Sequence, residues 1–384
     1  MSLLKILRVK YNNISLYDNN EFEVDFTALD RVADKDQVYV VNNKIYTQKV
    51  ITFIGINATG KTTTLKLINF ILEILINERS LNSEGLTGKI YIENNTKITV
   101  NFVYKNKIYE WIAIIGKNSL NKLYFEEEFI KEKSMSSIKS KKDIYNFSFI
   151  EKSFIRSDLK DVLKYLKAED SIIKGFIGEV ENDVYELMPY TDANLFLVPN
   201  EKIPTEFINA FDSSIEMFNC KHESGIQYEL KFKGADNFIK VNNPFELCNV
   251  ISSGTIKGQN IMFRIAKALE MGGYIIIDEL ENHFNKEIVK TIIDIFKNPK
   301  INPRGACLIF STHYAEILDS IDRKDNIYIT RKNNLYRIEV LNYSTQKIRS
   351  DLKKSDVILS DIINGTAPQY ENLQKLKEYL CQSI

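Results

Sequence analysis

A phosphate-binding pattern stands in the first quarter of the chain. The stretch Gly55-Ile56-Asn57-Ala58-Thr59-Gly60-Lys61-Thr62 has the G-x-x-x-x-G-K-[ST] spacing, in which backbone N–H groups fold around a phosphate. The lysine adds a full positive charge near the β and γ phosphates, and the threonine hydroxyl that follows is a ligand for Mg²⁺. The spacing therefore predicts a site for ATP and Mg²⁺. The residues expected to bind the nucleotide here are Gly55, Asn57, Ala58, Thr59, Gly60, Lys61, Thr62 and Thr63.

This loop needs a strand before it and a helix after it. The apolar, β-branched run 50–54 predicts a buried parallel strand. Leu65, Ile68, Leu72 and Leu75 then recur at helical spacing, which predicts a helix running to about residue 78. The loop is thus expected to join a strand to a helix, as a phosphate loop must.

Two acids follow a second apolar run late in the chain. Residues 274–277 are all apolar and end in Asp278 and Glu279, which is typical of a buried parallel strand that delivers carboxylates at its C-terminal edge. We expect Asp278 to hold Mg²⁺, through water or Thr62. Because strand side chains alternate, Glu279 should point differently and polarise the attacking water. Taken alone, acids that merely cap a strand would give the same pattern.

Two further motifs flank that strand. Ser252 and Gly254 open a stretch with helical apolar spacing, and an ordinary helix N-cap presents the same residue types. His313 ends another apolar run at 305–313, where an incidental surface histidine is the alternative. The chain has only three histidines. We therefore predict that His313 lies beside the γ-phosphate and acts in catalysis with Glu279 and Lys61.

The remaining elements follow from period and turn residues. We predict a charged, exposed loop over 126–142, helices over 157–182 and 203–218, and strands over 3–9, 21–26, 37–41, 44–46, 89–93, 98–104, 108–115, 225–234 and 238–241. The expected domains are an N-terminal lobe with the phosphate loop (1–80), an inserted β-meander and helical region (81–244), and a C-terminal lobe with the other motifs (245–384).

Composition narrows the class of protein. The 384 residues hold 51 Lys plus Arg and 51 Asp plus Glu, so the whole-chain field attracts neither nucleic acid nor an anionic membrane. Four cysteines without metal-ligand spacing predict neither a zinc site nor a disulfide framework. No apolar run is long enough to cross a bilayer. We expect a cytoplasmic protein with no membrane partner.

Together these motifs resemble the ATP-binding cassette ATPases, and more narrowly their SMC/RecF/OLD-like branch. Asn57 is typical of that branch's loop, the stretch 278–283 resembles its acidic strand, and 311–313 matches its switch histidine. The residues 349–351 and 364–368 are similar to the tail of small ATPases of bacterial defence loci, as in the PARIS and AbiL/RloA two-gene systems. The resemblance implies an α/β P-loop NTPase fold with an ABC-type core, in which helices flank a mixed sheet, with an N-terminal antiparallel part and an inserted α+β region.

The resemblance also implies an assembly. Two chains would form a head-to-tail homodimer around two ATP molecules, with each phosphate loop facing Ser252 and Gly254 of the other chain. Two features depart from the family pattern: the signature reads Ser-Ser-Gly-Thr, and Gln227 is the sole glutamine between the phosphate loop and the signature. It falls in a predicted strand, so the Q-loop role is unassigned. OLD nucleases carry a nuclease domain after the ATPase, and the 71 residues after His313 are too few for one.

Three functions fit these observations. The first is a defence ATPase that acts as sensor and regulator and gates a separate, nuclease-like effector. The second is a RecF-like DNA repair or recombination ATPase, in which the lysines of 131–142 contact DNA and binding weakens with salt. The third is a nucleotide-gated scaffold with little turnover. Glu279 argues against it, because a glutamate at this position is expected to activate water for hydrolysis.

Overall fold

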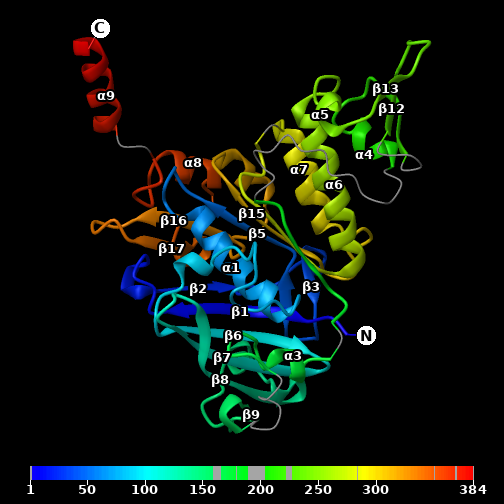
Figure 1. Cartoon of the computed structure of the whole chain (residues 1–384). Coiled ribbons are helices and arrows are strands. Elements are labelled where there is room, and N and C mark those ends of the chain that lie inside the picture. The colour runs from blue at the N-terminus through cyan, green and yellow to red at the C-terminus, as the bar shows by residue number, and fades with distance from the viewer. Residues whose placement is uncertain are drawn as a thin grey trace.

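The computed structural model describes residues 2–158, 166–178, 180–188, 204–221, 227–282, 284–349, 351–367 and 370–383. Two six-stranded sheets organise these residues (Figure 1). One is mixed, has the order β10-β14-β15-β5-β16-β17, and carries the phosphate loop; all its neighbouring pairs except β16 and β17 are parallel. Its strands are β5 (Val50–Ile54), β10 (Val184–Glu186), β14 (Tyr274–Ile277), β15 (Cys307–Thr312), β16 (Ile327–Lys332) and β17 (Ile338–Asn342).

The second sheet is antiparallel and has the order β2-β1-β6-β7-β8-β9. Its strands are β1 (Lys5–Asn12), β2 (Glu21–Asp25), β6 (Thr96–Tyr104), β7 (Lys107–Lys117), β8 (Leu123–Ser134) and β9 (Phe154–Ile155). The smaller sheets pair β3 (Val38–Val40) with β4 (Tyr46–Gln48), and β11 (Ile215–Lys221) with β12 (Gln227–Phe232) and β13 (Ile239–Val241).

Helices cover both faces of the mixed sheet. α1 (Lys61–Leu75) lies on one face, and α6 (Ser253–Met271) and α7 (Lys286–Lys297) lie on the other. The remaining described helices are α2 (Lys141–Ile144), α3 (Ile173–Phe176), α4 (Thr205–Asn209), α5 (Pro244–Leu247), α8 (Lys354–Leu359) and α9 (Tyr370–Ser383). Twelve of the fifteen residues of α1 are buried, because α1 lies between the two sheets (Figure 1). The alternation of β5 explains the two cores: Ile51 and Phe53 pack with α1, whereas Val50 and Ile54 pack with α6 and α7.

These layers confirm the predicted α/β class, with a mixed sheet flanked by helices and an antiparallel N-terminal part. The region 81–244 contributes strands to both large sheets. Within it, the stretch 204–241 also holds a three-stranded sheet with its own small core. The division into domains at residues 80 and 244 stays a prediction. In the part of the chain that the structure describes, no helix has the length and apolar character needed to cross a bilayer.

The predicted loop over 126–142 is wrong, because its first half belongs to the long strand β8. Its buried residues are Leu123, Phe125, Glu128 and Ile130, so the alternation skips one residue. A β-bulge opposite Ile114 and Ile115 of β7 causes that skip. The bulge turns two consecutive glutamates outward and hides the strand period in the sequence.

Three other element predictions are corrected. Residues 89–91 form a 3-10 turn and not a strand. The helix predicted over 203–218 ends at Asn209, since the Asp212 carboxylate accepts from the Ser214 N–H at 3.0 Å and turns the chain into β11. Within 157–182, α3 is the one α-helix in the described residues; residues 159–165 and 179 lie outside them, as do the first two residues of the strand predicted over 225–234.

Candidate nucleotide-binding site

The phosphate loop has the backbone that its glycines permit. It connects β5 to α1 at the carboxyl edge of the mixed sheet, with positive φ at Ala58 (63°) and Gly60 (98°). A Cβ atom on Gly60 would lie 2.4 Å from the Cδ1 atom of Ile338, and one on Gly55 would lie 2.2 Å from the Thr330 carbonyl oxygen. Both positions therefore require glycine, as the motif predicts.

The Lys61 ammonium is held inside this loop. Its Nζ donates to the carbonyl oxygens of Gly55 (2.8 Å) and Ile56 (3.0 Å) and lies 3.3 Å from Nδ1 of His313. The side chain is 5% exposed. Burial lowers the pKa of Lys61 to about 8, against the opposing pull of three nearby carboxylates, of which Asp278 and Glu279 are the strongest.

Oxygen ligands for Mg²⁺ meet beside the loop. The Thr62 hydroxyl donates to Oδ2 of Asp278 at 2.5 Å, and the Ser311 hydroxyl donates to Oδ1 of the same carboxylate. Hydroxyl and carboxylate oxygens suit Mg²⁺, which takes few protein ligands and completes its shell with phosphate oxygens and water. Among the described residues no group of three His, Cys, Asp or Glu side chains forms a metal site. Thr62 and Asp278 therefore fit the ion and would hold it.

Glu279 lies beyond the end of β14, in the left-handed region at φ 50°. Its N–H donates to Oγ of Ser311 at 2.8 Å, and its Oε1 lies 3.0 Å from Nε2 of His313. Asp278 contacts Thr62 and Ser311, whereas Glu279 contacts His313, so the two carboxylates have different partners as expected. The predicted reason is wrong, because both acids follow the last residue of β14 and do not alternate along a strand. A non-glycine residue at positive φ is uncommon and often marks a functional site.

The contacts of His313 fix its tautomer. Lys61 has only donors, so Nδ1 of His313 must accept. Nε2 then carries the proton and donates to Glu279. The backbone N–H of His313 donates to Oε1 of Glu281 at 2.6 Å. Glu281, 7% exposed, thus holds the histidine in place; the sequence motif included this residue but no role was inferred for it.

These groups line an open cavity of about 390 Å³, within the range of ligand pockets. The predicted residues that line it are Asn57, Ala58, Gly60, Lys61, Thr62, Thr63, Glu279 and His313. Four others were missed, because they come from distant segments: Leu16, Tyr91, Lys332 and Ile338. Thr59 lies under the loop. Its hydroxyl donates to the Ile56 carbonyl at 2.8 Å and lies 2.9 Å from the Thr330 hydroxyl.

Ser252 and Gly254 do not line this cavity. Ser252 is exposed and is the N-cap of α6, where its Oγ accepts from the Thr255 N–H at 3.1 Å. Within one chain the structure thus brings together the phosphate loop, the acids and His313, but not the signature. His283, the last residue of the motif that begins at Asp278, lies outside the described residues, as do Ser350 and Pro368 of the tail motifs.

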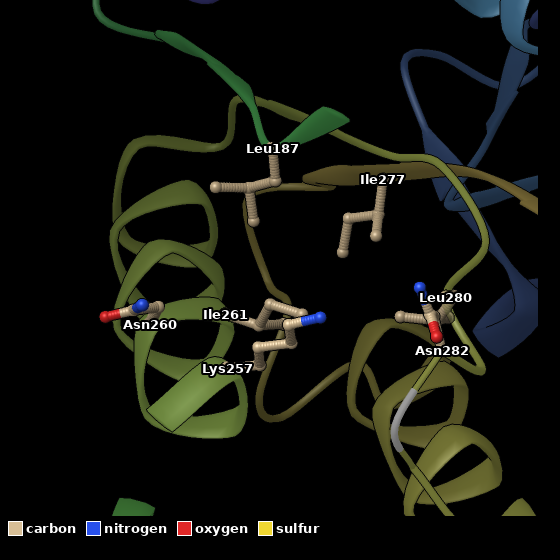
Figure 2. Close-up of a pocket in the computed structure, with 7 residues that line it drawn as sticks. All are labelled: Leu187, Lys257, Asn260, Ile261, Ile277, Leu280 and Asn282. Carbon is tan, nitrogen blue, oxygen red and sulfur yellow. The ribbon is translucent and has the colours of Figure 1, made fainter. Parts of the chain in front are cut away.

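A small second cavity shows how α6 packs on the acid-bearing strand (Figure 2). It measures about 10 Å³, enough for about one water molecule. Its lining residues are Leu187, Lys257, Asn260, Ile261, Ile277, Leu280 and Asn282. Lys257 is 3% exposed and comes from the second turn of α6, while Ile277 and Leu280 flank the two acids. The helix that Ser252 begins is therefore packed directly against the segment that carries Glu279.

The fold and the loop define a class. A phosphate loop at the carboxyl edge of a mixed sheet, with an Asp–Glu pair directly after the next strand but one, makes this chain a P-loop ATPase of the ABC/AAA type. Residues 50–319 match the model of the AAA domain family described as putative AbiEii toxin, Type IV TA system. The match spans well over half of the chain, which belongs to this family. No curated protein matches it.

Proposed function

We propose that this protein hydrolyses ATP in a Mg²⁺-dependent reaction. The observation that carries the proposal is the convergence of Lys61, Glu279 and His313 on one cavity, which Thr62 also lines and where it contacts Asp278. When bound, Mg²⁺ neutralises charge on the phosphates. Glu279 accepts the proton of the attacking water, and His313, itself a donor to Glu279, orients that carboxylate.

Replacement of the base tests this role. Glu279→Gln should retain ATP binding and slow single-turnover hydrolysis by ~10²–10⁴-fold, as loss of a general base does. Glu316→Gln is a matched control, because Glu316 belongs to the short helical segment after His313 and does not line the cavity. Hydrolysis by Glu279→Gln at the wild-type rate would place the base elsewhere.

We further propose that the active form is a head-to-tail homodimer in which Ser252 and Gly254 of one chain complete the γ-phosphate site of the other. Support comes from the exposure of Ser252 and from its absence from the cavity of its own chain. Helix α6, which Ser252 begins, packs against the segment that carries Glu279 (Figure 2). A contact that Ser252 makes across the dimer can therefore change the position of the catalytic base. ATP then holds the dimer together, and hydrolysis loosens it.

Mixed dimers test the shared site. Ser252→Arg should leave ATP binding by the monomer nearly intact and abolish hydrolysis. Mixing Ser252→Arg with Lys61→Ala chains puts both lesions in one composite site, so activity should reappear above that of either homodimer, and ATP-dependent crosslinking should report the mixed dimer. Normal hydrolysis by Ser252→Arg at all protein concentrations would make Ser252 an ordinary helix cap.

For the cellular role, we propose a cytoplasmic sensor and regulator of a bacterial anti-phage system, close to the SMC/RecF/OLD-like branch, which gates a separately encoded effector. The family description as a putative toxin of a type IV toxin–antitoxin system supports a second protein in the system. Co-purification of the chain with the product of the neighbouring gene, with and without ATP, tests the proposal. Failure of the two proteins to associate in either state would contradict it.

The RecF-like alternative is less well supported. The lysines assigned to DNA are largely engaged within the protein: Lys133 and Lys141 donate to backbone carbonyls at 2.5–2.9 Å, and Lys131 does so at 3.2 Å. A phosphate would have to compete with these carbonyls for three of the five lysines, and only Lys139 and Lys142 in this segment are exposed without such a bond in the described structure. DNA binding that weakens steeply with salt would restore this alternative. The scaffold alternative predicts ATP binding without turnover.

A further inference from the structure

Lys332 is a second lysine of the nucleotide cavity. It is the last residue of β16, two positions after Thr330, whose hydroxyl contacts Thr59 under the phosphate loop at 2.9 Å. Because side chains alternate along a strand, Thr330 and Lys332 share the face that meets the loop. Arg331 lies on the other face, where it pairs with Glu339 at 2.5 Å.

The Lys332 ammonium has no counter-ion among the residues that the structure describes. Within the described ranges, no carboxylate or carbonyl lies within ion-pair or hydrogen-bond distance of its Nζ. Burial lowers the pKa of Lys332, and no carboxylate in the described part of the chain opposes the effect. Lys61, by contrast, has two carbonyl partners and three acids nearby. A partly buried cation without a partner favours an anion from outside the chain.

Strand order gives the two ends of the cavity different chemistry. In the sequence β14-β15-β5-β16-β17, Glu279 and His313 follow β14 and β15, on one side of the phosphate loop. Lys332 and Ile338 lie on β16 and β17, on the other side, with strands spaced about 4.8 Å apart. Since Lys61 binds the β and γ phosphates and the catalytic groups mark the γ end, the nucleoside end of the ligand falls at β16 and β17.

We propose that Lys332 binds the α-phosphate of the nucleotide, while Leu16, Tyr91 and Ile338 form the apolar wall against its nucleoside. This inference rests on the proposed function, in which the cavity holds ATP. It makes Lys332 a binding residue shared by ATP and ADP, because the α-phosphate is common to both.

The hairpin of β16 and β17 holds Lys332 in position. Nδ2 of Asn333 donates to Oδ1 of Asp18 at 2.9 Å, and Arg337 donates to Oδ1 of Asn20 at 3.1 Å. The N–H of Ile338 also donates to the Leu16 carbonyl at 2.8 Å. The hairpin is therefore fixed to the connection between β1 and β2, so the backbone position of Lys332 does not depend on a ligand.

Calorimetric titration with ATP and with ADP tests the assignment. Lys332→Met keeps the apolar stem and removes the charge, and it should weaken both nucleotides by the same factor, about tenfold, as expected for one charged hydrogen bond. Lys332→Arg should restore most of the affinity. Lys300→Met is the control: it removes an exposed lysine after α7, at the opposite edge of the sheet, and should bind like the wild type.

Each result has a separate meaning. A loss confined to ATP would put Lys332 at the γ-phosphate and overturn the inference, as would unchanged affinity for both nucleotides or no rescue by Lys332→Arg. If Lys332→Met melts far below the wild type, Lys332→Gln takes its place in the same comparison. Failure of the wild-type chain itself to bind either nucleotide would overturn the proposed function, whereas wild-type binding with an unaffected variant overturns the Lys332 assignment alone.

Discussion

The two six-stranded sheets place their polar groups differently. In the mixed sheet the strands β5, β14 and β15 are buried along their length, and chemistry begins where they end, at Gly55, Asp278 and His313. In the antiparallel sheet a charge lies in the middle of a strand: Glu128 of β8 is 1% exposed. Parallel strands gather polar groups at one edge, open to a ligand. The antiparallel sheet instead uses its buried charge to hold the chain together.

The environment of Glu128 shows this structural use. Its carboxylate accepts from Nε1 of Trp111 (2.9 Å), from Arg156 (2.9 Å), from the Ser171 hydroxyl and from the Ile172 N–H (3.1 Å). These donors come from β7 and from the segment after β9, so one side chain joins residues 111 to 172. The comparison predicts that changes at Glu128 act on folding, and changes at the edge of the mixed sheet act on ligand binding.

The largest effect on folding is expected for Glu128→Ala. Its four donors lose their acceptor, and Arg156, 8% exposed, loses its counter-ion, so the free energy of unfolding should fall by ~3–5 kcal/mol. Glu126→Ala, at an exposed position of the same strand, should change it by under about 0.5 kcal/mol. Urea titration measures both variants. Equal stability of the two would contradict a structural role of the Glu128 cluster.

Lys61→Ala should show the opposite behaviour. The phosphates lose the one side-chain charge that the loop supplies, so ATP affinity should fall at least ~10²-fold, with a small change in melting temperature. Lys66→Ala removes a charge from the same helix, one turn beyond the loop, and should bind ATP as the wild type does. Unchanged affinity of Lys61→Ala would remove the basis of the phosphate-loop assignment.

Local sequence patterns predicted the parts of the site that are local in the chain. The loop from Gly55 to Thr62 is one continuous segment, and its glycines, lysine and threonine act within a few residues of one another. Asp278 and His313 were predictable because each follows an apolar run, and the ends of parallel strands meet at one edge. The close approach of Gly55 to Thr330, by contrast, depends on β16 being the neighbour of β5.

What was missed depends on pairing between distant segments. Lys332 and Ile338 reach the cavity through the order of the strands, and Tyr91 through a 3-10 turn that resembles a strand in sequence. In the sequence, Glu128 belongs to a run of glutamates that indicates a solvated surface. In the structure, the β-bulge in β8 turns its side chain inward. A single sequence carries the period of a strand, but neither its partner nor the bulge that shifts its register.

The pH dependence of binding extends the comparison to charge. Burial lowers the pKa of Lys61 from its ordinary 10.5 to about 8, so the side chain carries its positive charge below pH 8 and loses the proton, and the charge, above it. The phosphates favour the charged form, so ATP affinity should be level near pH 7 and fall about tenfold per pH unit well above pH 8. Titrations from pH 7 to 9.5 measure this. Lys332→Arg should keep the profile and Lys61→Ala should flatten it; a level wild-type profile would contradict the assignment.

The smallest expected effect concerns the contact between the phosphate loop and β16. The Thr59 hydroxyl donates to the Ile56 carbonyl and forms a hydrogen bond with the Thr330 hydroxyl. Both threonines are almost fully buried. Thr59→Val removes these bonds at nearly constant volume, so stability should fall by about 1 kcal/mol and ATP affinity by less than tenfold, with recovery in Thr59→Ser. If the contact positions the loop, Thr59→Val and Thr330→Val should combine less than additively in a double-mutant cycle read by ATP affinity. Additive losses would mean that each hydroxyl acts separately, and that β16 contributes to the cavity only through the residues that line it.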